Sequence, residues 1–415
     1  MTTLSRYALT TLGISLATVA QAQPIVVADS GDSAWVLAAS ALGLIAALPG
    51  LALLHGRRDG VHGPAIVLSA AIATLVFAAL GYSLAFSEGG SIIGGADNAM
   101  LANMAEMHAD LTISDIVFAL YQLTVALFAV GIMVSSIAHR ARIGWLGGFV
   151  AVWSLIVYAP VAHWIWGGGW LSDLGVLDFG GGLVVQVAAG TATLVAALLI
   201  GRGGIDDDAA EAVTVTVTGA GAVPALRHAG LALTLVGWIG ILGGAAFGGG
   251  DDAATAMLNG LLAASAAVLV GFAIARWRES PGGDDGVATA AIAGLAAIST
   301  GAAFVGPAGA MALGVGGALA AWAGSVLVRQ LNVGTTASAF VASGCGGIVG
   351  AVAFPLFVSP IFGGPGFDEG VGLLTQTVAQ GVGVLVVILW SAVVTAIAAL
   401  MVSMIAPMRV AGRFE

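Results

Sequence analysis

Long apolar segments dominate this sequence and decide what kind of structure it can form. Eleven of them approach or exceed the ~20 residues that a helix needs to cross a bilayer. Charged residues make up only 8% of the 415 residues, whereas soluble domains carry about 25%. We therefore predict an all-α integral membrane protein with eleven transmembrane helices. The expected spans are 33–55, 63–87, 111–138, 143–165, 179–200, 224–247, 253–275, 286–304, 307–328, 335–358 and 372–405.

The arginines predict how these spans are oriented. The chain has no lysine, so its twelve arginines carry all of the fixed positive charge. With an external N-terminus and eleven crossings, every arginine after Arg6 falls on the cytoplasmic side, as is typical of inserted proteins. We predict a multi-pass protein of the inner (cytoplasmic) membrane, with the C-terminus in the cytoplasm. These arginines are Arg57, Arg58, Arg140, Arg142, Arg202, Arg227, Arg276, Arg278, Arg329, Arg409 and Arg413.

The N-terminus has the pattern of an export signal. Arg6 precedes an apolar run over 7–19, which ends in Ala20-Gln21-Ala22, a small-x-small cleavage motif. We predict a signal peptide over 1–22, a transmembrane domain over 23–405 and a short cytoplasmic tail over 406–415. The alternative is an uncleaved first helix, but the run is shorter than a bilayer span.

The predicted external loops are acidic, and two interpretations of this charge remain open. They could form a solvated surface, or they could attract cations toward an outer vestibule. The acidic residues are Glu88, Asp97, Glu106, Asp110, Asp173, Asp178, Asp251, Asp252, Asp368 and Glu369.

An odd number of spans in each half predicts internal inversion. If spans one to five and six to ten are related, the fold consists of two inverted five-helix repeats plus a long last helix, and such repeats build transport pathways at their interface. The segments "VVQVAAG" in the fifth span and "FVASGCGG" in the tenth share a weak similarity in their pattern of apolar, polar and glycine positions.

Several motifs carry a family resemblance. The segments "ALPGLALLHG", "LGYSLAFSEGG", "AHRARIGWL", "VAHWIWGGGWLSDLGVLDFGGG" and "GCGGIVG" follow one another along the chain. Together they resemble the ammonium transporter family, which includes the Rh proteins, over essentially the whole mature chain. The resemblance implies eleven spans, inverted halves, and a homotrimer in membrane lipid with one narrow pore in each subunit.

The resemblance also implies an outer cation site that leads past stacked phenylalanines to a pore with two facing histidines. Trp166 takes the place of the tryptophan of that site, and Asp178 that of the aspartate that structures it. Asp178 could cap the backbone N–H groups at a helix start, or it could bind a cation directly. We favour the capping role.

The pore positions depart from the family pattern. The two pore histidines fall on Gln186 and Ser343, and an amide or a hydroxyl cannot relay protons as an imidazole does. The other departures place two gate phenylalanines, the outer serine and an aspartate on Val125, Ile241, Ala245 and Ser338 respectively. All six histidines fall in loops or at span ends, so none replaces the pair: His55, His62, His108, His139, His163 and His228.

Three further polar residues near the third span are candidates. Asp115 is an ionisable residue close to the external end of an apolar span, and it either recruits cations or lies in the solvated interface. Tyr121 and Gln122 lie a turn or two deeper. They either line the vestibule or pack between helices.

The predicted function is conduction of ammonium, ammonia or a related small polar solute without a histidine proton relay. The alternative is a non-transporting ammonium sensor or regulatory paralogue, but sensors of this family usually carry a signalling domain. The short tail also argues against docking of a nitrogen-regulatory signal protein. No nucleophile–base pair, cofactor motif or ligand cluster indicates an enzyme, and we expect no cofactor, no metal site and no nucleic-acid partner.

Overall fold

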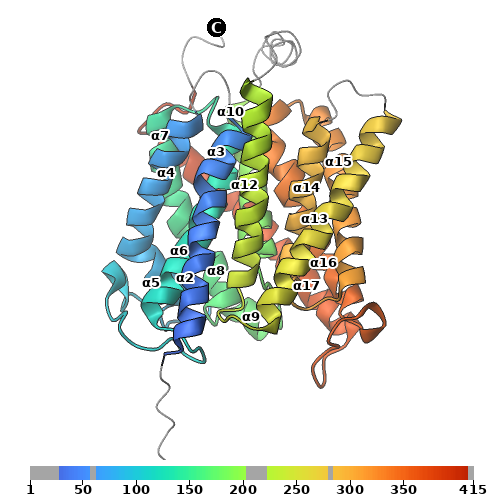
Figure 1. Ribbon diagram of the computed structural model, residues 1–415. Helices are drawn as coiled ribbons and strands as arrows, with labels where there is room; N and C mark the ends of the chain where they lie inside the picture. The colour runs from blue at the N-terminus through green and yellow to red at the C-terminus, as the bar shows by residue number, and fades with distance from the viewer. Residues whose placement is uncertain (1–27, 57–61, 202–221, 279–283, 410–415) are drawn as a thin grey trace, which may run out of the picture.

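The computed structural model describes residues 28–56, 62–201, 222–278 and 284–409. Apart from three isolated β-bridges, the regular structure of these residues is helical. Figure 1 shows an upright bundle in which most helices run along one common direction. The predicted signal peptide, 1–22, and residues 410–415 of the predicted tail lie outside the described residues.

The first half of the chain contributes five apolar spans, most of them built from consecutive helical segments. The labels α and η denote α-helices and shorter 3₁₀ or π segments. The segments are α2 (Ser30–Ile45), η2 (Ala46–Gly50), α3 (Leu51–Leu54), α4 (His62–Val76), η3 (Phe77–Gly81), α5 (Tyr82–Phe86), η4 (Ala99–Leu101), α6 (Asp115–Ile137), α7 (Ile143–Trp153), η5 (Ser154–Tyr158), α8 (Ala159–Trp166), α9 (Trp170–Asp173), η6 (Gly182–Val187) and α10 (Ala188–Ile200).

The second half adds five spans and the long last helix. Its segments are α12 (Ala222–Gly244), α13 (Asp251–Trp277), α14 (Asp284–Ser299), α15 (Pro307–Leu331), η7 (Gly334–Ala337), η8 (Phe340–Gly344), α16 (Cys345–Ala353), η9 (Phe354–Phe357), η10 (Pro360–Phe362) and α17 (Leu373–Ser403).

The predicted fold class is confirmed. Among the described residues, ten helices are long and apolar enough to cross a membrane, and each matches one predicted span. Their ends differ from the predicted ones by at most five residues, except that the fourth helix runs eight residues further, to Asp173. The eleventh predicted span, 286–304, contains α14, whose apolar part over Gly286–Ser299 is shorter than the others. The described residues therefore form an all-α membrane protein fold with eleven apolar spans, ten of bilayer length and one shorter.

The early end of α14 has a structural reason. The backbone carbonyls of Ser299 and Thr300 accept hydrogen bonds from Gly180 and Phe179, at 2.8 and 3.0 Å. These carbonyls therefore bond to the loop before η6 instead of continuing the helix. Almost every residue from 290 to 300 is buried, because α13, α15 and α16 surround α14. A helix that is enclosed by protein does not need the full length of a bilayer span.

The two halves lie side by side, and α17 packs against both. In Figure 1 the first half runs from blue to green on the left, and the second from yellow to orange on the right. Helix α2 packs against α12, α10 against η8, and η6 against α16, while α17 contacts α7, α10 and α16. These contacts place the ends of the fifth and tenth spans at the centre of the bundle.

The charges at the two ends of the bundle differ. Arg142 immediately precedes α7, and Arg276 and Arg329 lie in the last turns of α13 and α15, which all reach the top of Figure 1. Helix α9 lies at the bottom of Figure 1, and Asp178 follows its last residue, Asp173, by five positions. We call these regions the arginine end and the Asp178 end.

Close backbone approach holds the halves together at one point. A Cβ atom at Gly190 would lie 2.5 Å from the Cα of Gly344 and 2.6 Å from its N. Small residues at such crossings allow membrane helices to pack at short distance.

We expect Gly190→Ala to destabilise the protein by about 1–3 kcal/mol, because the added methyl group meets backbone that cannot rotate away. The thermal unfolding midpoint in detergent measures this loss. Gly144→Ala is the matched control, since no atom lies within 4 Å of a Cβ at Gly144. Equal midpoints for the two variants would contradict the close packing of α10 on η8.

Candidate conduction pathway

A cavity of about 360 Å³ lies at the Asp178 end, between α6, α8, α12 and the loops beside them. We call it the Asp178 cavity. Its lining residues are His108, Ala109, Leu111, Phe118, Tyr121, Gln122, Val125, Ile165, Trp166, Asp178, Phe179, Gly180, Ala245 and Phe247. Six of the eleven positions assigned from the sequence are among them, whereas Asp115, Gln186, Ile241, Ser338 and Ser343 are not.

Aromatic rings form much of the cavity wall. The Phe118 and Phe247 rings lie 5.1 Å apart between centroids, and Phe247 meets Tyr121 edge-on at 5.3 Å. The imidazole of His108 stacks on Phe118 at 3.7 Å. Such ring faces attract cations by about 0.5–2 kcal/mol each. The wall therefore suits a small cation.

Sequence reasoning missed eight of the lining residues, and four of these carry rings: His108, Phe118, Phe179 and Phe247. One of them had a usable signal, because Phe118 precedes Tyr121 and Gln122 by three and four positions on α6 and so shares their face. The others lie in loops, where no periodicity predicts direction. Phe247 even adopts a left-handed backbone, with φ 52°.

Asp178 fixes the start of η6. Its Oδ2 accepts hydrogen bonds from the backbone N–H groups of Leu183 and Val184, at 2.8 and 2.9 Å. The predicted capping geometry is therefore present. Its Oδ1 is buried without a hydrogen-bond partner. Burial raises the pKa of this carboxyl to about 6, although the backbone hydrogen bonds oppose the shift.

Trp166 and Tyr121 are both tied to backbone carbonyls. The Trp166 indole N–H donates to the carbonyl of Asp178 at 2.7 Å, and the Tyr121 hydroxyl donates to that of Ile241 at 2.6 Å. Both rings are thereby held in the wall. Gln122 differs from them, because its Oε1 is buried and unpartnered. The residue also lines the cavity.

The aliphatic positions divide into two groups. Val125 and Ala245 line the cavity. The side chain of Ile241 instead lies close to α2, since a Cβ at Gly43 would lie 2.9 Å from its Cγ1. The assignment of Ile241 to a gate therefore stays a prediction.

Gln186 and Ser343 lie deeper, on two π-helical turns that pack against each other, η6 and η8. A Cβ at Gly347 would lie 2.9 Å from that of Gln186, and Gly347 shares a helix face with Ser343 four residues earlier. Both predicted side chains are buried, at 0% and 2% exposure. Neither faces lipid, and π-helical turns are frequent at functional sites.

Asp115 and Ser338 pair with other side chains. Asp115 Oδ1 lies 2.7 Å from Nδ1 of His108, so it approaches the cavity only through that imidazole. The Ser338 hydroxyl bonds to the hydroxyl of Ser136 at 3.0 Å, between the two halves.

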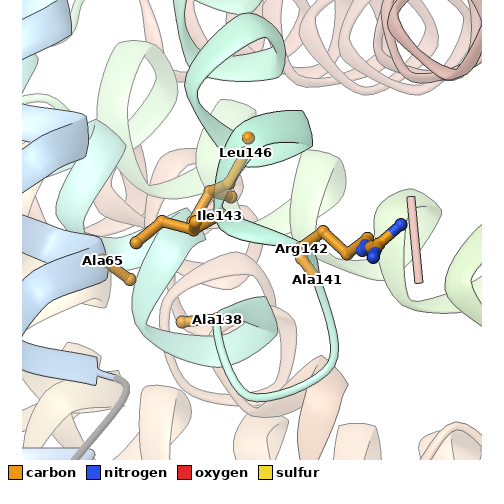
Figure 2. A pocket seen from close by; sticks show the side chains of 7 residues that line it. Ala65, Ala138, Ala141, Arg142, Ile143 and Leu146 are labelled. Atoms are coloured by element: carbon orange, nitrogen blue, oxygen red, sulfur yellow. The ribbon is translucent and has the colours of Figure 1, made fainter. Parts of the chain in front are cut away.

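A second cavity, of about 310 Å³, lies at the arginine end, where α6 turns into α7. Figure 2 shows its small apolar side chains, with the Arg142 side chain extending away from Ala65 and Leu146. It contains none of the predicted site residues. Its lining residues are Ala65, Ala138, Ala141, Arg142, Ile143, Gly144 and Leu146.

Comparison with known proteins identifies the family. The profile of the Ammonium Transporter Family matches residues 34–415. The ammonium transporter of Aquifex aeolicus is 33% identical over 398 residues, covering 93% of this chain and 90% of that protein. The ammonium transporter Amt1 of Archaeoglobus fulgidus is 33% identical over 339 residues, covering 80% and 82%. This chain belongs to the ammonium transporter family.

Solved structures agree with this membership. The crystal structure of Saccharomyces cerevisiae Mep2 matches with a TM-score of 0.81 at 26% identity, covering 93% of this chain and 88% of that one. Candida albicans Mep2 matches with a TM-score of 0.81 at 28% identity, covering 93% and 87%. The ammonium transporter family consists of non-enzymatic membrane transporters. The predictions of a multi-pass membrane transporter and of no enzymatic activity are therefore confirmed.

The two roles considered for Asp178 are separable by substitution. We expect Asp178→Ala to destabilise this transporter by about 2 kcal/mol, because two buried N–H groups lose their acceptor. Asp178→Asn keeps an acceptor oxygen, so most of the stability should return. The measurement is the unfolding midpoint in detergent, with Asp173→Ala on the exposed surface of α9 as control. Equal unfolding midpoints for all three variants would contradict the capping role of Asp178.

Proposed function

We propose that this family member conducts ammonium, ammonia or a related small polar solute through a pore without a histidine proton relay. The observation that carries this proposal is the environment of Gln186. Its side chain is fully buried, and neither its amide oxygen nor its amide nitrogen has a hydrogen-bond partner. Leaving a buried polar group unpaired costs about 1–3 kcal/mol. A polar solute that passes Gln186 would satisfy it.

Other unpartnered polar atoms extend this path. The buried atoms without a partner include Gln122 Oε1, Asp178 Oδ1, Tyr158 Oη and Thr191 Oγ1. They lie on α6, beside η6, on η5 and on α10, and η6 packs against α6 and α10 while α6 packs against η5. These donors and acceptors, on elements that pack around η6 and α6, support a polar conduit.

The chemistry of the central pair argues against proton relay. An amide and a hydroxyl keep their charge state at neutral pH, so the centre of this pore cannot exchange protons as a histidine pair would. Transport of a cation without deprotonation, or of a neutral solute, is consistent with Gln186 and Ser343. Potassium is a cation without N–H groups, so a comparison of potassium flux with ammonium flux shows whether the pore requires an N–H donor.

We expect native protein in liposomes to raise methylammonium uptake above that of empty liposomes, and Gln186→Leu to reduce it about tenfold by removing the hydrogen-bonding group. Thr193→Val is the control, because the Thr193 hydroxyl bonds within its own helix to the Ala189 carbonyl. The Gln186→His/Ser343→His double variant should gain a new pH dependence.

Two results would contradict this proposal. No native flux of ammonium, methylammonium or potassium above empty liposomes would exclude the cation version. Unchanged flux and pH dependence in the double variant would place Gln186 and Ser343 outside the pathway.

We also propose that three copies assemble, and that the Asp178 end faces outward. The trimer follows from the family resemblance, and the orientation follows from the arginine distribution. Exposed apolar residues such as Leu269 and Phe272 suit contact with lipid. In a Cys345→Ser background, a cysteine that replaces Asp173 should react with impermeant maleimide on intact cells, whereas one that replaces Gly144 should not. Cross-linking in native membranes should give a trimer. The reverse labelling pattern, or monomers only, would refute the respective proposal.

A further inference from the structure

His108 occupies a fixed position at the Asp178 cavity although it lies in a loop. Its backbone N–H donates to the carbonyl of Ile113 at 3.0 Å, and its carbonyl accepts from Leu111 at 3.2 Å. Its ring lies nearly parallel to that of Phe118, with 14° between their planes. The imidazole is therefore held both by backbone hydrogen bonds and by ring stacking.

Asp115 determines which ring nitrogen of His108 is the acceptor. Its carboxylate, at the first position of α6, lies 2.7 Å from Nδ1 of His108. A carboxylate accepts only, so in the neutral imidazole the proton is on Nδ1 and the lone pair is on Nε2. Within the described part of the chain, Nε2 has no hydrogen-bond partner, and the His108 side chain is 23% exposed.

Two more free acceptors lie around the same cavity. Gln122 Oε1 and Asp178 Oδ1 are buried and unpartnered, and both residues line the cavity together with His108. Ammonium and methylammonium carry several N–H donors on a positive charge. Potassium is also coordinated by oxygen acceptors, so among these three acceptors the imidazole nitrogen of His108 is the one that favours an N–H donor.

We propose that His108, oriented by Asp115, accepts a hydrogen bond from the N–H groups of an ammonium-type cation in the Asp178 cavity, and that protonation of His108 closes this site to cations. The residue thus determines specificity for N–H donors, and Asp115 is a positioning residue. This inference rests on the proposed function, because it assigns the recognition step of the same pathway.

Protonation removes the lone pair of Nε2 and places a positive charge at the cavity, so cation binding should weaken as the pH falls. The other ionisable groups on the elements around His108 are Glu106 and Asp110 in its loop, Asp115 and Tyr121 on α6, Tyr82 on α5, Asp178 before η6, and Asp32 on α2. Burial raises the pKa of Asp178 to about 6, so this carboxylate also loses its negative charge as the pH falls. Its contribution to the pH dependence must therefore be separated from that of His108.

The test measures binding of radiolabelled methylammonium to purified full-length protein at about pH 8 and at about pH 5.5. We expect His108→Phe, which keeps a ring to stack on Phe118, to weaken binding about tenfold at the higher pH. Potassium and ammonium are then added as competitors of methylammonium binding. Between the native protein and His108→Phe, inhibition by potassium should change less than inhibition by ammonium. The pH dependence that remains in this variant is that of Asp178 and should be shallower than in the native protein.

Two variants make the test specific. Asp115→Asn should weaken binding about threefold in the native background and have no further effect in His108→Phe, because it acts through His108. His108→Gln restores an acceptor that does not titrate, so it should bind at the higher pH and keep the shallow pH dependence. Asp173→Asn, an exposed carboxylate on α9, is the control for surface charge.

Native binding by His108→Phe, or additive effects of the two substitutions, would overturn the inference. Unfolding midpoints show whether each variant is folded, and His108→Gln keeps the test valid if His108→Phe is not. Native protein that binds but does not conduct would refute the proposed function alone. Native protein that conducts, together with a His108→Phe variant that binds normally, would refute this inference alone.

Discussion

The backbone N–H and carbonyl groups of the loop between the fourth and fifth spans need hydrogen-bond partners within the protein. The position of the rest of the proposed pathway depends on these hydrogen bonds. Inside a membrane protein, a free N–H or carbonyl has no water to bond. Here the Asp178 carboxylate accepts from the start of η6, Trp166 donates to the Asp178 carbonyl, and the end of α14 accepts from Gly180. These hydrogen bonds fix one loop to both halves of the bundle. They also fix the position from which η6 carries Gln186 inward.

The same loop explains why a single carboxylate serves both structure and electrostatics. One oxygen of Asp178 is used by the backbone, whereas the other is buried without a partner beside the cavity. Burial disfavours the ionised form and the hydrogen bonds favour it, which leaves the pKa at about 6. A cation in the cavity would favour the ionised form further. Cation binding and deprotonation of Asp178 are therefore linked, and each promotes the other.

Much of the fold followed from the sequence, but only part of the site did. Bilayer-length apolar runs and arginine asymmetry predicted the helices, and the spacing of Asp178 before an apolar segment predicted its cap. The short α14 was not predictable, because its end depends on hydrogen bonds to a loop more than a hundred residues earlier. For the same reason His108 and Phe247, which lie in loops, were missed: long-range packing decides their direction. Ile241 was placed by alignment alone, and its side chain packs toward Gly43.

The aliphatic side chain of Val125 does not leave the cavity without aromatic character. Phe118, about two turns before it on α6, stacks with His108 and packs against Phe247, so ring faces still line the cavity. The acceptors His108 and Gln122 lie in the same region. In the proposed pathway, a cation can therefore be selected before it reaches Gln186 and Ser343, which need only form hydrogen bonds to it. A pore that recognises its solute at the mouth does not need a titrating pair at its centre to discriminate between solutes, because specificity is set by differences in binding where the contacts are made.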